Sequence, residues 1–139
     1  MSNFEKNLEQ AINNAKRLTD KILIDGKLIS AQTNNKIPVL NPSTGDNIGS
    51  APQCNKDDVN IAVESAHKAF QKWKKIPARE RGKMVAAGAK RLEERKSEIE
   101  TLLSLDTGNA LRTQAIPETG ASIELTNMFA GLSGELKGE

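Results

Sequence analysis

Apolar residues recur at spacings of three and four along the first eighteen residues of the chain. They are Phe4, Leu8, Ala11, Ile12, Ala15 and Leu18. This spacing places them on one stripe of a helix whose other faces carry Asn, Lys and Glu. Thr19-Asp20-Lys21 ends the pattern, so residues 1–20 are predicted to form an amphipathic helix. We expect it to dock on the body of the protein or on another subunit. An independent targeting or partner helix is the weaker alternative, because the stripe holds few large residues.

Two short apolar runs, Ile22-Leu23-Ile24 and Leu28-Ile29, flank Asp25-Gly26. Asp-Gly between apolar runs predicts a β-hairpin with a type I′ turn, because both central residues of that turn need a positive φ. The chain after the first helix is therefore expected to begin with a pair of strands.

A further pair of strands is expected before residue 52. Ile37-Pro38-Val39-Leu40 predicts one of them, and Pro38 makes it an edge or irregular strand because proline has no N–H. Asn41-Pro42-Ser43-Thr44-Gly45 then predicts a turn, and residues 48–51 a short return strand.

The rest of the chain, after Pro52, has the periodicity of helices. Asn55 is a candidate N-cap, with Asp58 three residues on in an arrangement like a capping box. A nearly complete apolar helix face follows these two residues. It consists of Val59, Ala62, Val63, Ala66, Ala69, Phe70 and Trp73.

Three more helices are predicted. Pro77 favours the start of the second, because a missing N–H costs nothing in the first turn. Ser97 and Glu100 have the spacing of a capping box that opens the third, and Gly108 is suited to end it in a left-handed conformation. The fourth helix is expected to start near Pro117.

The composition indicates a soluble, mostly helical chain with a thin core. Its 139 residues suffice for one domain, but only 37 % are hydrophobic and 3 % aromatic. No run approaches the roughly 20 apolar residues of a membrane span. The acids Glu5 and Glu9 argue against a transit peptide. Cys54 is the single cysteine and has no partner for an internal disulfide, so we expect a cytoplasmic protein.

Positive charge is concentrated in one stretch. The chain has a net charge of +2, but residues 67–96 contain eleven Lys and Arg against three acids. Such a stretch could bind nucleic acid, since phosphate neutralisation drives that affinity. The nearby aromatics, Phe70 and Trp73, belong to the apolar helix face and offer no stacking platform. A solvated helical surface is therefore the favoured interpretation.

Few residues in the chain are candidates for chemistry. Cys54 lies next to a predicted helix start, which can lower a thiol pKa, but nothing places it beside His67, the only histidine. We expect Cys54 to be a loop residue and His67 to be solvated. One Cys and one His cannot supply a typical structural zinc site. No phosphate-binding glycine motif follows a strand.

The chain also offers no evident pair of carboxylates for acid–base work. Glu93 and Glu94 are adjacent, and Glu98 and Glu100 are two residues apart. Residues at these spacings do not face one another on a helix. We therefore expect no catalytic, cofactor-binding or metal-binding residue in this chain.

Short motifs in a fixed order resemble the N-terminal part of the NAD(P)-dependent aldehyde dehydrogenase superfamily. The resemblance covers Ile22 to Glu139. Its motifs are Asp25-Gly26, Asn41-Pro42-Ser43-Thr44-Gly45, the set Ala66, Ala69, Phe70 and Trp73, Arg79-Glu80-Arg81, Asp106-Thr107-Gly108 and Phe129-Ala130-Gly131. No single motif is specific to this family, but the order and spacing of all of them together are specific. The implied fold class is α/β, of which this piece is mostly α-helical with an N-terminal β-hairpin and short strands. Residues 21–139 would form an incomplete cofactor-binding domain.

The chain departs from the family pattern at three positions. Asn109 stands where the family usually has Lys, and Pro117 and Gly120 interrupt a helix that is normally continuous. The family sometimes coordinates a monovalent cation near the residue that is Asp106 here. Cys54 is not the family's nucleophile, because it precedes the first family helix.

The resemblance implies an NAD- or NADP-dependent oxidation of an aldehyde to a carboxylic acid in the full-length family. The family's nucleophilic Cys, general-base Glu, oxyanion-stabilising Asn and nucleotide fingerprint fall beyond the matched part. We therefore expect this chain to be inactive alone, and to associate with itself or with the remaining enzyme portion. The alternatives are a catalytically dead helical interaction module and, less favoured, a basic nucleic-acid-binding domain.

Overall fold

The computed structural model describes residues 3–135. Residues 1–2 of the predicted segment 1–20 and residues 136–139 of the predicted segment 21–139 lie outside it. The side chains of Asn3 and Phe4 lie outside it as well. The elements in chain order are α1 (Asn3–Leu18), β1 (Lys21–Ile24), β2 (Lys27–Ser30), β3 (Lys36–Leu40), β4 (Asn47–Pro52), α2 (Lys56–Trp73), α3 (Ala78–Glu94), α4 (Lys96–Thr107), a π-helical turn (Leu111–Ala115), α5 (Ile116–Gly131) and a 3₁₀ turn (Leu132–Gly134). Helices dominate and all four strands fall within residues 21–52, as predicted.

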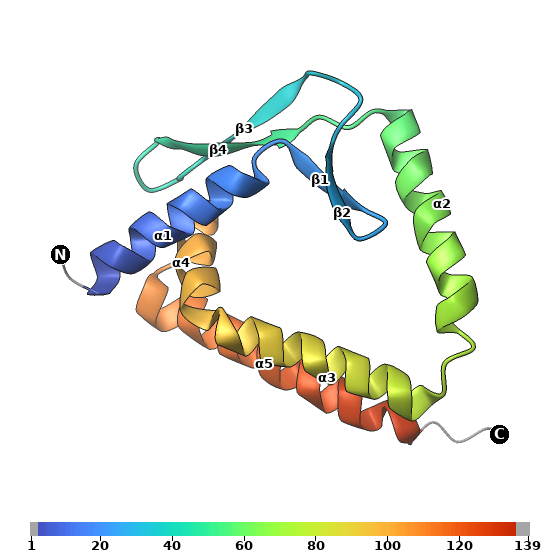
Figure 1. Cartoon of the computed structure of the whole chain (residues 1–139). Helices are drawn as coiled ribbons and strands as arrows, with labels where there is room; N and C mark the ends of the chain where they lie inside the picture. Colours follow the sequence, from blue (N-terminus) through green and yellow to red (C-terminus); the bar gives the residue numbers. More distant parts are fainter. Residues whose placement is uncertain (1–2, 136–139) are drawn as a thin grey trace.

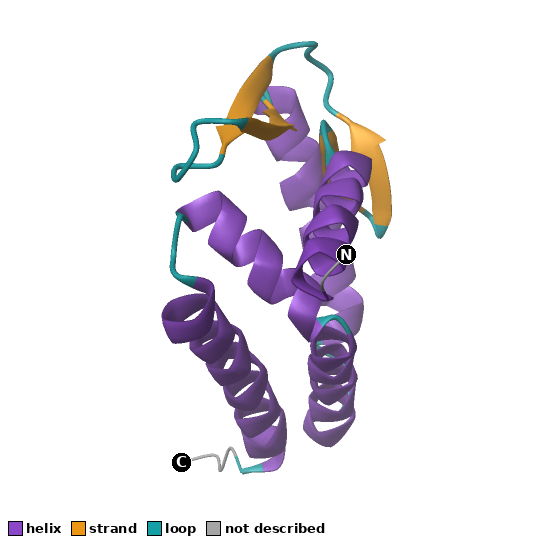
Figure 2. Cartoon of the chain, turned by 90° about the vertical axis from the view of Figure 1, so that its left-hand side faces the viewer, coloured by secondary structure: helices purple, strands orange, loops and turns teal. Residues whose placement is uncertain are grey.

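The elements form an open frame (Figure 1). Helices α3 and α5 lie side by side along one edge of it, and α1 packs against α4 at one corner. Both strand pairs gather at one end of the molecule, with the helices extending away from them (Figure 2). Helix α2 stands apart as an arm that connects the strand end with the start of α3.

The first hairpin forms as predicted. β1 and β2 pair antiparallel, with Ile22 opposite Ile29. The turn residues Asp25 and Gly26 both have positive φ, 53° and 72°. These values are those that a type I′ turn requires.

The second strand pair is also confirmed. β3 and β4 form a separate antiparallel sheet of two strands, so every strand is an edge strand and Pro38 costs no ladder bond to a third strand. The pairing shifts register between Val39 and Leu40, next to the turn. The turn itself is closed by Asn41 Oδ1, which accepts from Ser43 N at 2.9 Å, and by Gly45 at φ 78°.

The capping box of α2 is confirmed and does more than the sequence indicated. Asn55 Oδ1 accepts from Asp58 N at 2.9 Å, and Asp58 Oδ2 accepts from Asn55 N at 3.0 Å. The other Asp58 oxygen accepts from Gln32 N at 3.0 Å. This buried carboxylate therefore holds the loop after β2 against the start of α2.

The predicted capping box at Ser97 and Glu100 is wrong. Helix α4 begins at Lys96, because a single residue, Arg95, separates it from α3. Ser97 is already inside the first turn, where its Oγ accepts from Asn7 Nδ2 of α1 at 2.8 Å. A bidentate ion pair instead spans the start of the helix, from Arg95 Nε and Nη2 to the Glu98 carboxylate at 2.9 and 2.7 Å.

One other helix boundary shifts slightly. Pro77 precedes α3 rather than lying in it, and its carbonyl accepts from Glu80 N and Arg81 N. Gly108 ends α4 at φ 75°, as predicted. Helix α5 starts at Ile116, next to Pro117, as predicted, and a π-helical turn in which Ala115 N donates to Ala110 O precedes it. Because this wider turn leads directly into α5, Pro117 lies near the start of that helix and not in its middle.

The core is thin. Its buried apolar residues are Ala11, Ile24, Ala89, Ala115, Ile123 and Ala130. Helices α3 and α5 approach closely at Gly82, where a Cβ atom would come within 2.5 Å of Ala130 O and closer still to Ser133 Oγ. Close packing here depends on small side chains, because bulky ones are scarce in the chain.

Candidate functional site

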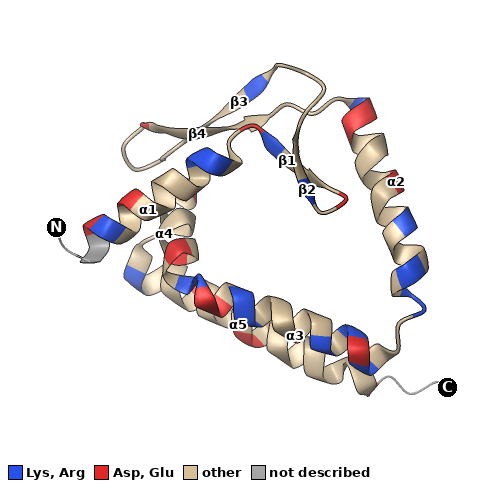
Figure 3. Cartoon of the chain, viewed as in Figure 1, with Lys and Arg blue, Asp and Glu red and all other residues tan. Residues whose placement is uncertain are grey.

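The basic stretch does not form a single patch. Lys and Arg spread over the second half of α2 and along α3 (Figure 3). Lys68, Lys83 and Arg91 each pair with an acid three or four residues away, at 2.7 to 2.8 Å. Arg81 donates to Ile76 O at 2.7 Å and helps to hold the turn between α2 and α3. These contacts favour a solvated, internally paired helical surface over a phosphate-binding one.

Cys54 and His67 lie where the sequence placed them, and the fold keeps them apart. Cys54 is exposed between β4 and α2. His67 is exposed on α2, and its Nε2 lies 3.1 Å from Gln71 Nε2. Twelve residues of helix separate His67 from the N-cap Asn55, about 18 Å at 1.5 Å per residue. The two side chains therefore do not form a nucleophile–base pair.

The acidic candidates are also separate from one another. Asp106 is exposed at the end of α4 and borders a hollow of about 420 Å³ between α1, β4 and α4. Glu93 and Glu94 pair with Lys96 and Arg91, respectively. Glu98 binds Arg95, whose hydrogen bonds hold the pKa of the Glu98 carboxyl below its ordinary value. Across residues 3–135 no group of three or more Cys, His, Asp and Glu could hold a metal ion.

The starts of α2 and α4 do not fit the pyrophosphate of a dinucleotide cofactor. A pyrophosphate needs free backbone N–H groups at a helix N-terminus, usually reached through a glycine-rich loop. At the start of α2 the N–H of Asp58 is taken by Asn55, and Asp57 and Asp58 would repel an anion. At the start of α4, the preceding helix ends one residue away, which leaves no loop. The starts of α2 and α4 therefore lack the free N–H groups and the loop that a pyrophosphate needs.

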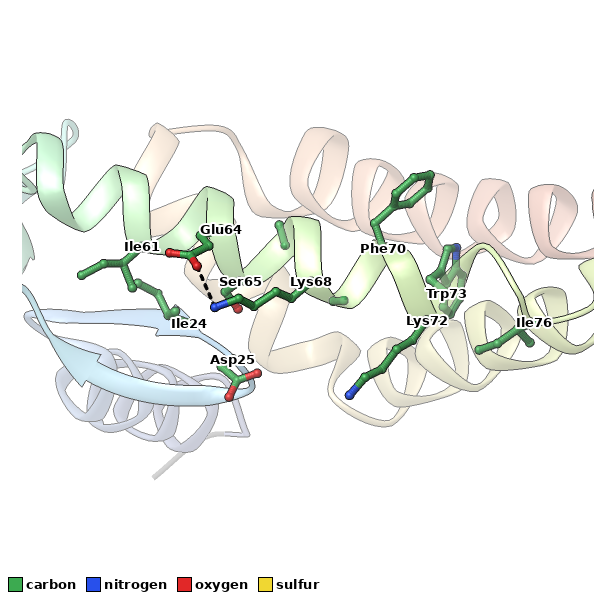
Figure 4. A pocket seen from close by; sticks show the side chains of 12 residues that line it. Ile24, Asp25, Ile61, Glu64, Ser65, Lys68, Phe70, Lys72, Trp73 and Ile76 are labelled. Atoms are coloured by element: carbon green, nitrogen blue, oxygen red, sulfur yellow. Dashed lines mark ion pairs between the residues drawn. The ribbon is translucent and has the colours of Figure 1, made fainter.

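A hollow of about 860 Å³ lies between α2 and the first hairpin (Figure 4). Ile24 of β1 and Ile61 of α2 point toward one another at one end of it, and Ile76 borders the other end. Polar residues share the lining with these apolar ones. They are Asp25, Glu64, Ser65, Lys68 and Lys72.

The electrostatics of this hollow argue against proton transfer. Glu64 Oε1 lies 2.7 Å from Lys68 Nζ. The hydrogen bond lowers the pKa of Glu64 and raises the pKa of Lys68, so both stay charged near neutral pH. Because both pKa values move away from neutral pH, the pair is a poor general acid–base catalyst there. The mixed lining suits a partner surface that is apolar at its centre and polar at its edge.

The apolar face predicted on α2 forms, but no described element covers it. Val59, Val63 and Phe70 are 55 %, 62 % and 53 % exposed, and Trp73 is 38 % exposed. Phe70 and Lys72 point to opposite sides of the helix (Figure 4). Lys74 Nζ lies 5.7 Å from the centre of the Phe70 ring. We call Val59, Val63, Phe70 and Trp73 the α2 face.

A cluster of polar side chains around Asp20, which the sequence did not predict, connects α1 to the second strand pair. Asp20 has a φ of 60° between α1 and β1, and its carboxylate accepts from Ser50 Oγ at 2.6 Å and from Lys36 Nζ. The hydrogen bond from Lys36, followed by that from Ser50, lowers the pKa of the Asp20 carboxyl. The cluster ties the end of α1 to the second strand pair. Its members are up to 30 residues apart, so no local pattern marks it.

No helix in the described part of the chain is both long enough and apolar enough to cross a membrane.

Comparisons with known proteins point to one family. The sequence model of the aldehyde dehydrogenase family matches residues 28–139. An aldehyde dehydrogenase of Talaromyces stipitatus is 38 % identical over 128 residues, which are 92 % of this chain and 25 % of that protein. The phenylacetaldehyde dehydrogenase of Pseudomonas fluorescens is 34 % identical over 88 % of this chain and 25 % of its own length. The chain thus spans about a quarter of these relatives.

Solved structures agree with this. The crystal structure of HpcC from Thermus thermophilus superposes with a TM-score of 0.89 over 97 % of this chain and 26 % of its own, at 23 % identity. The betaine aldehyde dehydrogenase of Staphylococcus aureus in complex with NAD⁺ gives a TM-score of 0.83 over 91 % of this chain and 25 % of its own, at 27 % identity. The open frame is therefore the arrangement of the corresponding quarter of these larger proteins.

Proposed function

Because the chain belongs to the aldehyde dehydrogenase family, we propose that it supplies the N-terminal part of an aldehyde dehydrogenase. Residues 21–139 would form one edge of the cofactor-binding domain, and residues 1–20 a helix docked on it. In this role the chain takes part in the oxidation of an aldehyde to a carboxylic acid with NAD or NADP. In this proposal the chain is active only together with the other three quarters of an aldehyde dehydrogenase. We place this activity in the cytoplasm.

One observation carries the proposal. The family match runs from residue 28 to residue 139, and the backbone superposes over nearly the whole chain, yet only about a quarter of each relative is covered. Cys54 and His67 lie apart in the described part of the chain, and the starts of α2 and α4 do not suit a pyrophosphate. These observations favour a structural contribution to an enzyme over catalysis by this chain alone.

The proposal is tested by activity in two settings. The purified chain with NAD or NADP and a set of aldehydes is expected to show no turnover. In a chimera, residues 28–139 replace the matching segment of the Pseudomonas fluorescens phenylacetaldehyde dehydrogenase, to which the chain is 34 % identical. This chimera is expected to oxidise phenylacetaldehyde with a nicotinamide cofactor. Turnover by the chain alone, or a folded chimera without activity, would contradict the proposal.

A second candidate is a helical interaction module without catalysis. The exposed α2 face favours it, because large apolar patches on a protein surface mark interaction sites. A compact monomer that melts cooperatively and binds no hydrophobic dye would count against this candidate.

A further inference from the structure

Polar contacts fasten helix α1 near its two ends. At the C-terminal end, the Asp20 carboxylate accepts from Ser50 Oγ at 2.6 Å and from Lys36 Nζ. Asp20 N also donates to Ser50 O at 3.2 Å. Towards the N-terminal end, Asn7 Nδ2 donates to Ser97 Oγ of α4 at 2.8 Å, in a contact that is exposed to solvent. The cluster at Asp20, which also has the covalent link to β1, therefore holds more firmly than the contact at Asn7.

The middle of α1 is poorly packed. Hollows of about 650 and 420 Å³ lie between α1, α4 and the second strand pair. Thr19, Ile48 and Gly49 border both of them, so the two hollows adjoin. Among the apolar stripe residues of α1 whose side chains the structure describes, only Ala11 is buried, and Leu18 is 51 % exposed. Little buried apolar surface therefore holds α1 in place.

The helices of the frame are held in different ways. Helices α3 and α5 meet so closely at Gly82 that a Cβ atom has no room there, and each of them buries an apolar side chain, Ala89 and Ile123. Helix α1 instead makes one more polar contact with α4, from Asn14 to the Glu98 carboxylate. Water competes for polar contacts near the surface, so their net contribution is modest. Of these three helices, α1 is the one that separates from the frame most readily.

The residues between α1 and β1 are suited to be a hinge. Thr19 and Asp20 lie outside both elements, because α1 ends at Leu18 and β1 begins at Lys21. Hinges are commonly a few residues at the ends of elements that absorb a change of φ and ψ. Asp20 is anchored to Ser50 on the side of the strands. A rotation at Thr19 therefore moves α1 while β1 stays paired with β2.

We propose that α1 is a hinged lid, which covers the two hollows when it is docked and swings away from α4 as a unit about Thr19. The contact between Asn7 and Ser97 holds the lid closed. Opening uncovers Ile48 of β4 and Leu105 of α4, which line the larger of the two hollows. The lid does not depend on the proposed function, because its contacts all lie within residues 3–135.

Amide hydrogen exchange of the full chain tests this proposal. A helix that opens as a unit gives its amides one common opening constant. For residues 7–18 we expect this constant to be at least about tenfold larger than for α3 and α5, while β1 stays protected. A terminal helix that only frays shows exchange rates that fall steadily from its start to its end. Such a gradient in α1, or equal opening constants in α1, α3 and α5, would overturn the proposal.

Two substitutions of the same kind isolate the contact that holds the lid closed. Asn7→Ala removes the donor to Ser97, whereas Asn13→Ala changes an exposed residue of the same helix. Both raise helix propensity by similar amounts, so the difference between them reports the contact. The opening constant of α1 should be about twofold to tenfold larger in Asn7→Ala than in Asn13→Ala. Equal constants in the two variants would contradict the proposal.

A disulfide supplies the converse test. Asn7→Cys and Ser97→Cys place two thiols where the present side chains touch, and Cys54→Ser removes the one other thiol. Oxidation should slow exchange throughout α1 to the level of α3 and α5, and reduction should restore it. Unchanged exchange in α1, with the disulfide confirmed by mass, would show that α1 does not open at this end. If the disulfide does not form, the comparison of the two alanine variants decides.

Discussion

Gly82 is the position where one added methyl group tests the packing of α3 against α5 most directly. A Cβ atom there would lie 2.5 Å from the carbonyl oxygen of Ala130, with Ser133 Oγ even closer. Real Cβ atoms do not approach backbone oxygen to this distance, so the two helices must separate locally. Gly82→Ala is therefore expected to destabilise the chain although alanine is the better helix former.

The magnitude follows from two opposing terms. Overpacking of a close contact costs about 1–3 kcal/mol. Replacing glycine by alanine inside a helix contributes about 0.8–1 kcal/mol in the other direction. The net loss is therefore about 0–2 kcal/mol, and we expect its upper half because the added atom meets backbone as well as a side chain. For a chain of this length a loss of about 1–2 kcal/mol lowers Tm by about 3–10 °C.

Gly88 provides the matched control on the same helix. It is exposed, and an added Cβ would find no atom within 4 Å. Gly88→Ala should therefore raise stability by about 0.5–1 kcal/mol. Urea titrations followed by circular dichroism compare the two variants with the unmodified chain. Equal stability of the two alanine variants would refute the packing argument at Gly82.

Three other predictions follow from caps, turns and ion pairs. Asn55→Ala should lower the free energy of unfolding by about 1 kcal/mol, because it leaves Asp58 N without its acceptor. Amide exchange should become faster only in the first turn of α2. Gly108→Ala should cost at least about 1 kcal/mol in the same titration, because Gly108 has a φ of 75° and a Cβ would lie 2.9 Å from Pro42 Cγ; an unchanged midpoint would contradict this. Asp20 has a lowered pKa in the folded chain, so its stabilising effect is present above its unfolded pKa of about 3.9 and is lost as pH falls through the folded value. Asp20→Asn, which retains the ability to adopt a positive φ, should therefore be less stable than the unmodified chain at neutral pH, and this difference should shrink in titrations run below about pH 4; a constant difference would show that charge is not the cause.

Local patterns predicted the elements of this chain well. The Asp25-Gly26 turn, the Asn55–Asp58 capping box and the end of α4 at Gly108 each depend on residues within four positions of one another. Backbone conformation and hydrogen bonding at that range follow from residue type. The error at Ser97 shows the limit, because its hydroxyl is taken by Asn7, 90 residues away.

The candidate site was less predictable than the elements. The sequence placed Cys54, His67 and Asp106 correctly on a loop, a helix and a helix end, and the structure keeps them on separate surfaces. Neither the Asp20 cluster nor the hollow between α2 and the first hairpin could be read from spacing. Both bring together side chains from segments that only the folded chain makes neighbours.

The amino-acid sequence by itself determined the order of helices and strands, the turn types, the apolar stripe of α2 and membership of the family. These properties depend on short-range periodicity and on motifs in a fixed order. Only the tertiary structure decided that α2 stands away from α3 and α5, and that its apolar stripe is open. A stripe indicates that a helix must bury one side, but what covers that side depends on atoms distant in sequence or in another polypeptide.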